Sequence, residues 1–236
     1  MDLRIRRAQK KILDIFARRA GSFALAGGTA LEFYYLYHRF SFDLDFFSPK
    51  YELNEIADLV AEFRKAAKSK IKLESEFIAG GRAKVRFYTL PVEGSARPLK
   101  IYFVEDTLFT KPVIKIFAGV PVYSAENIYI QKLVAIGGIQ PEIDEIGRQW
   151  TQGRREARDI FDLYMLSMKI KPLHIFLKNA SGVIQKGIIH WYQTFSRQEL
   201  KLALLDLDIY DKKFDAQEMI IYLENEIKQF IKQVLE

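Results

Sequence analysis

The sequence predicts an α+β fold, in which a mixed β-sheet with flanking helices is followed by a C-terminal helical domain. Two observations indicate this arrangement. Short alternating apolar runs, typical of strands, lie between residues 23 and 117, whereas the apolar residues beyond residue 121 recur at helical spacing. We therefore expect an α/β domain over residues 1–120 and a helical domain over residues 121–236.

The composition is that of an ordinary globular protein. The 236 residues are 49% hydrophobic and 28% charged, enough for one large domain or two small ones. Met1-Asp2-Leu3-Arg4 opens a charged helix rather than a signal peptide, and no apolar run is long enough to span a bilayer. We expect a cytoplasmic protein with no membrane partner. The absence of cysteine excludes disulfides, thiolate metal sites and cysteine nucleophiles.

The chain carries a formal net charge of +6, and its basic residues are unevenly distributed. Two clusters stand out, Arg4, Arg6, Arg7, Lys10 and Lys11 in the first and Arg64, Lys65, Lys68, Lys70 and Lys72 in the second. This excess is compatible with a nucleotide or RNA partner, and it is equally compatible with ordinary solvated helix faces.

Apolar spacing and turn residues divide the chain into its elements. In the first domain we expect helices over 2–20, 31–38 and 52–68, and strands over 23–26, 42–47, 71–78, 83–90, 99–104 and 113–117. Gly80-Gly81 is the expected turn of a hairpin. In the second domain we expect helices over 125–136, 154–168, 173–178, 183–195 and 216–235, with a loop or interrupted helix over 137–153.

The first motif with chemical use is the pair Gly27-Gly28, which follows a short buried strand and precedes a helix. Glycines tolerate positive φ, so they can present successive backbone N–H groups around an anion, and a helix N-terminus adds to this effect. Thr29 is placed to add a hydroxyl group.

The second motif is Asp43-Leu44-Asp45 on the next strand. Side chains alternate along a strand, so Asp43 and Asp45 share one face, while Phe42, Leu44 and Phe46 point to the core. Two carboxylates opposite a phosphate-sized concavity are suited to holding Mg²⁺ against a nucleoside triphosphate. Taken separately, the two motifs are also compatible with an ordinary turn and the solvated face of an edge strand.

Together, the strings Gly27-Gly28-Thr29-Ala30-Leu31 and Tyr37-His38-Arg39-Phe40-Ser41-Phe42-Asp43-Leu44-Asp45-Phe46-Phe47 resemble the nucleotidyltransferase signature. More narrowly, they resemble the AbiEii-type (MenT-like) toxin nucleotidyltransferases. The resemblance implies a nucleotidyltransferase-like sheet, with Asp43 and Asp45 as ligands of Mg²⁺ or Mn²⁺. The nucleotide-binding candidates are Gly27, Gly28, Thr29, Arg39 and Ser41, with a structural role as the alternative for Ser41.

The C-terminal half extends the resemblance through Lys132, in a Lys-x-x-Ala helix, and Asp159, in an Arg-Asp-x-x-Asp-Leu-Tyr helix. The family pattern implies phosphate or base contact for Lys132 and a catalytic or positioning role for Asp159. Asp159 and Asp162 lie three residues apart, so they share one helix face, where Lys132 could pair with Asp159 or reach a triphosphate. The alternative is that these residues and Arg158 form an interhelical salt-bridge cluster.

The sequence departs from the family pattern at Tyr102, which stands where a third carboxylate is expected on a later strand. Glu105 would face the other side of that strand, and Asp106 lies ~13 Å further along it at ~3.3 Å per residue. The sequence thus provides two metal ligands. A third carboxylate commonly helps to activate the attacking hydroxyl group.

The resemblance implies a Mg²⁺-dependent enzyme that transfers a nucleoside monophosphate from an NTP to a hydroxyl group of RNA (tRNA) or of a protein. It also implies a toxin of a toxin–antitoxin or phage-defence system, with a cognate antitoxin as partner. The departure at Tyr102 motivates the alternative, a catalytically inert nucleotide- or RNA-binding module that has the same fold and acts through a partner protein.

Overall fold

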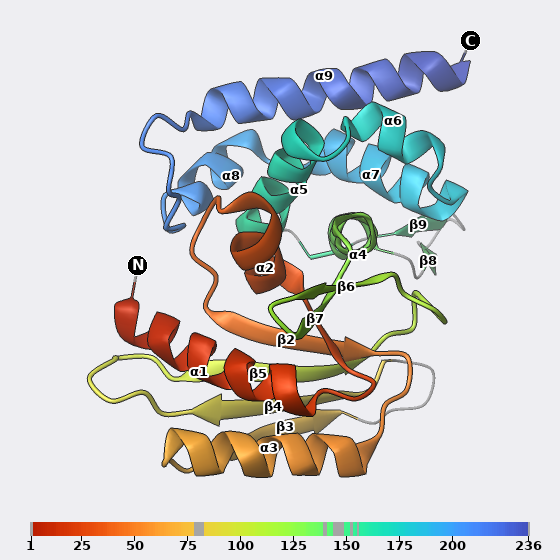
Figure 1. Ribbon diagram of the computed structural model, residues 1–236. Helices are drawn as coiled ribbons and strands as arrows, with labels where there is room; N and C mark the ends of the chain where they lie inside the picture. The colour runs from red at the N-terminus through yellow and green to blue at the C-terminus, as the bar shows by residue number, and fades with distance from the viewer. Residues whose placement is uncertain are drawn as a thin grey trace. The chain divides into compact units, whose positions relative to one another are not determined.

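The computed structural model describes residues 2–77, 83–138, 141–143, 149–151, 153–154 and 156–235 (Figure 1). The chain forms two compact units: unit 1 contains Met1–Tyr34 and Ser41–Ser124, and unit 2 contains Tyr35–Phe40 and Ala125–Glu236. The segment Tyr35–Phe40 therefore packs with the helical unit, although the sequence-based division at residue 120 placed it in the α/β domain.

Unit 1 contains a mixed sheet, which the described residues build from seven strands in the order β3-β4-β5-β2-β1-β7-β6. The strands are β1 (Ala24–Ala26), β2 (Asp43–Ser48), β3 (Lys72–Phe77), β4 (Val85–Leu90), β5 (Leu99–Glu105), β6 (Ile114–Phe117) and β7 (Val120–Tyr123). β2 runs antiparallel to β1 and parallel to β5, and β1 runs parallel to β7. The predicted mixed sheet with flanking helices is confirmed.

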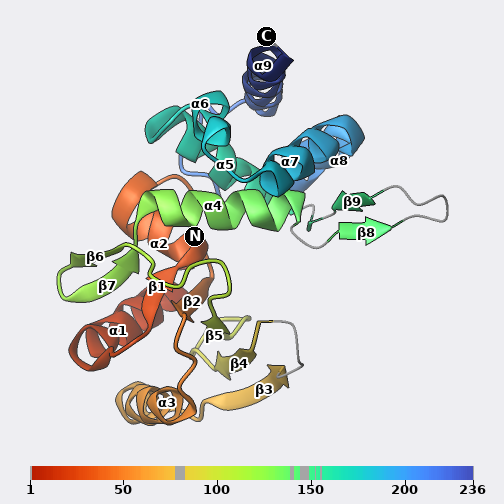
Figure 2. The same cartoon turned by 90° about the vertical axis from the view of Figure 1, so that its right-hand side faces the viewer.

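Two helices, α1 (Leu3–Arg19) and α3 (Leu53–Ala67), cover one face of this sheet (Figures 1 and 2). Phe46 of β2 is fully buried beneath them, with its ring centroid 4.2 Å from that of Phe16, 6.1 Å from that of Phe63 and 5.4 Å from that of Phe103. This aromatic cluster fixes which face of β2 is internal, and so which face carries its polar residues.

The helix observed after β1 differs from the helix expected over residues 31–38. The helical turn α2 (Gly27–Ala30) already includes both glycines, and it continues as a π-helix, η1 (Leu31–Leu36). The helix ends at Leu36 because Tyr37 adopts a left-handed conformation with φ of 46°.

Two further sequence predictions for unit 1 are wrong. Phe42 is 37% exposed and precedes β2, so it does not belong to the core. β7 was missed because Pro121 was taken as the start of the helical region, yet Pro121 pairs with Ile116 in β6. The Gly80-Gly81 turn lies outside the described residues, while the strands on either side of it pair antiparallel as expected.

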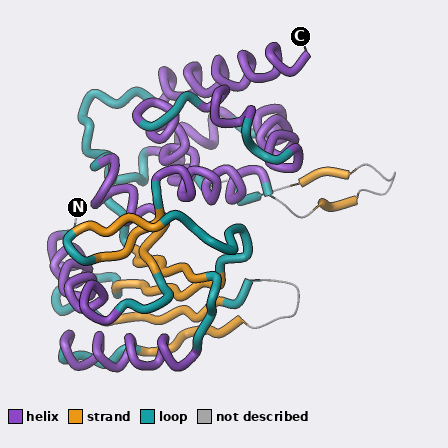
Figure 3. Tube along the Cα trace, turned by 45° about the vertical axis from the view of Figure 1, so that its right-hand side comes forward, coloured by secondary structure: helices purple, strands orange, loops and turns teal. Residues whose placement is uncertain are grey.

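Unit 2 is mainly helical (Figure 3). Its elements are α4 (Ala125–Gly137), β8 (Pro141–Ile143), β9 (Gln149–Thr151), α5 (Ala157–Lys169), α6 (Leu173–Lys178), α7 (Gly182–Thr194), α8 (Arg197–Leu204) and α9 (Ala216–Leu235). The sequence analysis missed α8 and gave no strands to 137–153, where β8 and β9 pair antiparallel. No helix in the described part of the chain has the length and apolar character needed to cross a bilayer.

The aromatic cluster makes a stability prediction with an internal control. Phe46→Ala leaves a cavity among three rings and should lower the free energy of unfolding by about 3–5 kcal/mol. Phe42→Ala removes a partly exposed ring and should cost less than about 1 kcal/mol. Urea denaturation of both variants measures the difference, and equal losses would contradict the assignment of the core face.

Candidate nucleotidyltransferase site

The pairing of β1 with β2 brings the glycine motif against the carboxylates. Ala26, the last residue of β1, pairs with Asp45. Gly27 follows with a φ of 68°, and a Cβ added there would collide with the carboxylate of Asp45. This position therefore requires glycine both for its backbone conformation and for the space that the carboxylate occupies.

The two residues after Gly27 complete the motif. Gly28 and Thr29 are buried in the first helical turn, and only Gly27 of the glycine pair has positive φ. The hydroxyl group of Thr29 donates a hydrogen bond to the backbone carbonyl of Asp43. Thr29 thus ties the glycine turn to the strand that carries the carboxylates.

The carboxylates lie on one face of β2, as predicted. Leu44 and Phe46 are fully buried, whereas Asp43 and Asp45 are partly accessible. The predicted separation of the strand into an apolar and an acidic face is confirmed for β2 itself, and it places the carboxylates on the face opposite α1 and α3.

A buried polar network holds the segment before β2. Glu32 accepts hydrogen bonds from Arg6 and from the backbone N–H of Ser41, at 2.9 Å for the latter. Gln9 donates to the carbonyl of Ser41 at 2.8 Å. The backbone of Ser41 is therefore fixed from both sides, which supports the structural alternative for this residue. Glu32 and Gln9 were missed because neither belongs to a recognisable motif.

Tyr102 occupies the strand position beside the carboxylates. In the parallel pairing of β2 with β5, Asp45 pairs with Tyr102 and Asp43 with Lys100. Tyr102 stacks on Phe87 of β4, with ring centroids 4.6 Å apart and planes 10° from parallel. Asp45, Tyr102 and Phe87 thus lie side by side on β2, β5 and β4.

The two acids after Tyr102 have other partners. Glu105 accepts hydrogen bonds from the side chain and backbone N–H of Lys84, at 2.9 and 3.1 Å. Asp106 is buried and accepts from the hydroxyl group of Tyr123 at 2.7 Å and from two backbone N–H groups. Neither supplies the missing third carboxylate.

The donor set fits a Mg²⁺ ion that is shared with substrate. Mg²⁺ is usually held by one or two carboxylates together with substrate phosphates and water rather than by a cage of protein ligands. Asp43 and Asp45 provide such a pair, and among the described residues no group of three or more potential ligand side chains gathers into a closed metal site.

In unit 2, the carboxylate of Asp162 lies at the centre of a buried charge cluster. Arg39 donates to both of its oxygens at 2.7 Å, His38 Nε2 lies 2.7 Å from Oδ1, and Lys132 Nζ lies 2.7 Å from Oδ2. Arg39 also pairs with Ile209 in an isolated bridge. These contacts explain why Tyr35–Phe40 packs with the helical unit.

Lys132 bridges the two aspartates of α5. Its ammonium group lies 2.6 Å from Asp159 Oδ1, and the other oxygen of Asp159 accepts from Arg154 Nε at 2.6 Å. Lys132 and Asp159 are both buried, whereas the side chain of Arg154 is 55% exposed. The predicted pair of Lys132 and Asp159 forms. Arg154 was missed because it lies outside the Arg-Asp-x-x-Asp-Leu-Tyr motif, and α5 begins only at Ala157 rather than at residue 154 as expected.

Charge pairing outweighs burial in this cluster. Burial alone would raise the pKa of Asp162, but Arg39, Lys132 and His38 hold it well below its usual range. Burial likewise opposes ionisation of Asp159, and Lys132 and Arg154 hold its pKa below the usual range. Both carboxylates are therefore ionised at neutral pH.

Comparisons with known proteins identify the family and the fold of the chain. The family model described as "Nucleotidyl transferase AbiEii toxin, Type IV TA system" matches residues 12–230. The chain belongs to the AbiEii nucleotidyltransferase toxin family. That match confirms the resemblance found in the sequence, and it covers most of both units.

Two crystal structures share the fold of this AbiEii family member. JHP933 from Helicobacter pylori has a TM-score of 0.62 and 20% identity over 98% of this chain and 94% of its own. A second H. pylori structure, whose protein is classed provisionally as a nucleotidyltransferase, has a TM-score of 0.60 and 21% identity over 99% of this chain and 97% of its own. No curated protein sequence matches the chain.

The contact of Gly27 with Asp45 gives a test of the glycine motif. Gly119→Ala should cost about 1–2 kcal/mol of unfolding free energy, because Gly119 also has positive φ but leaves room for a Cβ. Gly27→Ala should cost at least about 1 kcal/mol more, since Asp45 must move. Thermal and urea denaturation compare the pair, and equal costs would contradict the contact.

The buried cluster predicts a pH-dependent effect of Asp162→Asn. The variant leaves Arg39 and Lys132 short of a counter-charge and should lose about 3–5 kcal/mol at pH 7. Because the folded-state pKa of Asp162 is depressed, its contribution is fully present above the unfolded pKa of about 3.9 and is lost progressively as pH falls from there through the lower folded-state pKa.

Urea denaturation at pH 7 and near pH 3.5 should therefore show a smaller difference between wild type and Asp162→Asn at the lower pH. Glu224→Gln, which removes a pair with the half-exposed Arg197, is the matched control and should cost less than about 1 kcal/mol. A loss for Asp162→Asn that does not change with pH would contradict the assignment.

Proposed function

We propose that this AbiEii family member is a Mg²⁺-dependent enzyme, with Mn²⁺ as an alternative ion, that transfers a nucleoside monophosphate from an NTP to a hydroxyl group of RNA. The observation that carries the proposal is the juxtaposition of Gly27 with Asp45, which sets backbone N–H groups beside two carboxylates of one strand face. Phosphate and a divalent cation require these two kinds of group together.

Asp43 and Asp45 would hold the ion, and the backbone of Gly27, Gly28 and Thr29 would bind the triphosphate. A Mg²⁺ ion held by these two carboxylates would supply neutralisation of the phosphate charge. The protein's part is to orient the α-phosphate toward the acceptor hydroxyl, which forms the new ester as pyrophosphate leaves.

The residues around β2 support this orienting role. The carbonyl of Asp43 is fixed by Thr29, and the backbone of Ser41 is fixed by Glu32 and Gln9. The backbone that leads into β2 and carries Asp43 is thereby held before substrate binds, which lowers the entropic cost of reaching the reactive geometry.

Arg39, Lys132 and Asp159 remain candidates for the same reaction. All three are buried in the charge cluster of unit 2, where each already makes a short ion pair. Direct contact of Arg39 or Lys132 with a phosphate would require one of these pairs to open. We therefore assign the cluster a positioning role, in which it fixes the segment that leads into β2.

The acceptor and the partner follow from charge and family. A net charge of +6 favours a polyanionic acceptor, so we propose RNA, including tRNA, over a protein hydroxyl group. The Type IV toxin family implies a cognate antitoxin. The second candidate is an inert binding module of the same fold. It rests on Tyr102, which pairs with Asp45 and stands where a third carboxylate is expected.

A transfer assay tests the proposal. Purified protein is incubated with each α-phosphate-labelled NTP, Mg²⁺ and total RNA, and the products are separated on a gel. We expect label on RNA, and a decrease of at least ~100-fold in Asp43→Asn and Asp45→Asn. Asp58→Asn, an exposed carboxylate on α3, is the matched control and should leave the rate unchanged.

The outcomes separate the candidates. Label that persists in Asp43→Asn and Asp45→Asn would contradict the metal assignment, and label on protein alone would replace RNA as the acceptor. NTP binding without label on any acceptor would favour the inert module.

A further inference from the structure

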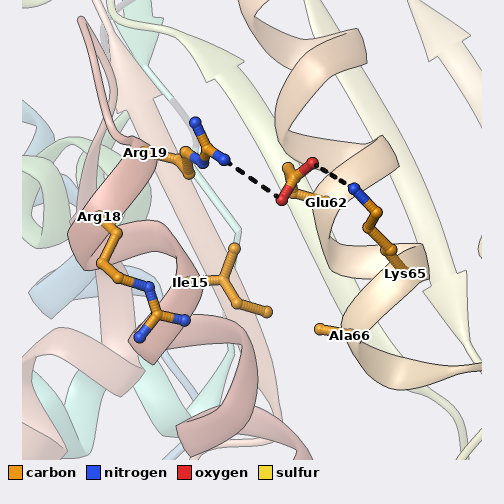
Figure 4. A pocket seen from close by; sticks show the side chains of 6 residues that line it. All are labelled: Ile15, Arg18, Arg19, Glu62, Lys65 and Ala66. Atoms are coloured by element: carbon orange, nitrogen blue, oxygen red, sulfur yellow. Dashed lines mark hydrogen bonds and ion pairs between the residues drawn. The ribbon is translucent and has the colours of Figure 1, made fainter.

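A basic surface lies over the C-terminal turns of α1 and α3. The first of its two hollows has a volume of about 220 Å³ and is shown in Figure 4. Its lining consists of Ile15, Arg18 and Arg19 from α1 and Glu62, Lys65 and Ala66 from α3. Ile15 and Ala66 are its apolar part, and the remaining side chains are charged.

The second hollow, of about 440 Å³, lies at the C-terminal end of α3. It is lined by Arg64, Lys68, Ser69 and Lys70. Together the two hollows present six cationic side chains and one carboxylate. We call these lining residues the α1–α3 basic surface.

The single carboxylate does not neutralise this charge. Glu62 lies 3.7 Å from Arg19 and 3.5 Å from Lys65, whose side chains are 61% and 78% exposed, and such exposed pairs are weak (Figure 4). Within the part of the chain that the structure describes, Arg18, Arg64, Lys68 and Lys70 form no ion pair. The surface therefore has cations available for an anionic partner.

Helix dipoles account for only part of this arrangement. Basic residues in the last turn of a helix are favoured by its dipole, which explains Arg18, Arg19, Arg64 and Lys65. Lys68 instead occupies the left-handed position after α3, with φ of 51°, where glycine is preferred. Lys70 lies beyond the helix, so the dipole of α3 does not explain it.

The location of the surface limits what can bind there. α1 and α3 cover the sheet face of Leu44 and Phe46, whereas Asp43 and Asp45 point to the opposite face of the same sheet. A ligand on the basic surface would not occupy the carboxylate site. A small anion could not connect the two faces, but a polymer of phosphates could.

We propose that the α1–α3 basic surface binds the sugar–phosphate backbone of the acceptor RNA at a distance from its reacting end. The inference rests on the proposed function for the identity of the polymer. Contacts of Lys and Arg with phosphates release counterions, so binding is independent of sequence and falls steeply with salt. The surface thus selects acceptors by length and charge.

Fluorescence anisotropy with labelled tRNA, without NTP or Mg²⁺, tests the surface directly. The variant is the triple substitution Arg18→Gln, Lys65→Gln and Lys70→Gln in the full-length chain. Its matched control removes the same charge from exposed lysines elsewhere in unit 1, by Lys50→Gln, Lys111→Gln and Lys115→Gln. Circular dichroism checks that both variants fold.

We expect the surface variant to bind tRNA about tenfold more weakly, with a log–log salt slope that is smaller by about 2, and the control to bind within about twofold of wild type. In the transfer assay, the surface variant should raise KM for tRNA at unchanged kcat and leave transfer to a trinucleotide unaffected.

Three results would overturn the inference. Equal weakening in both triple variants would show that only overall charge matters, and unchanged binding in the surface variant would show that RNA does not use this face. If wild type prefers polyglutamate or anionic vesicles to tRNA, the surface serves another partner. Because binding is measured without nucleotide, an inactive enzyme that binds RNA here would contradict the proposed function alone.

Discussion

The antiparallel pairing of β1 with β2 is the constraint on which the candidate site depends. It pairs Ala26 with Asp45 and so places Gly27 directly against that carboxylate. Any side chain at residue 27 would displace Asp45. The glycine motif and the acidic motif therefore form one site, although a helix and a connecting segment separate them in the sequence. The aromatic packing of Phe46 under α1 and α3 fixes the direction in which the carboxylates point.

A buried ion pair holds the segment just before β2 to the helical unit. Arg39, only four residues before Asp43, is held by both oxygens of Asp162. Removing two charges from water is costly, and this cost is offset by short hydrogen bonds to every oxygen of the carboxylate. Such a cluster fixes one arrangement of the segment that precedes β2, which is the property expected of a positioning element.

Much of the fold was predictable, because strands and helices follow from apolar spacing and the two motifs from residue chemistry. The prediction that Phe42 belongs to the core is wrong because the alternation of side chains was extended one residue beyond the strand. The strand β7 was missed because Pro121 was interpreted as a domain boundary, yet proline is tolerated near the end of a strand. Glu32, Gln9 and Arg154 could not be found from sequence, since their roles arise from tertiary contacts. The family resemblance placed Tyr102 where a third carboxylate is expected on a later strand, and the strand register pairs this residue with Asp45.

The most direct test of the central claim is calorimetric titration of wild type and Asp45→Asn with an NTP, in the presence and absence of Mg²⁺. The account predicts that wild-type affinity depends on Mg²⁺ and that Asp45→Asn loses most of the Mg²⁺-dependent part. Equal affinities of the two proteins, with or without the ion, would contradict a metal site at Asp43 and Asp45.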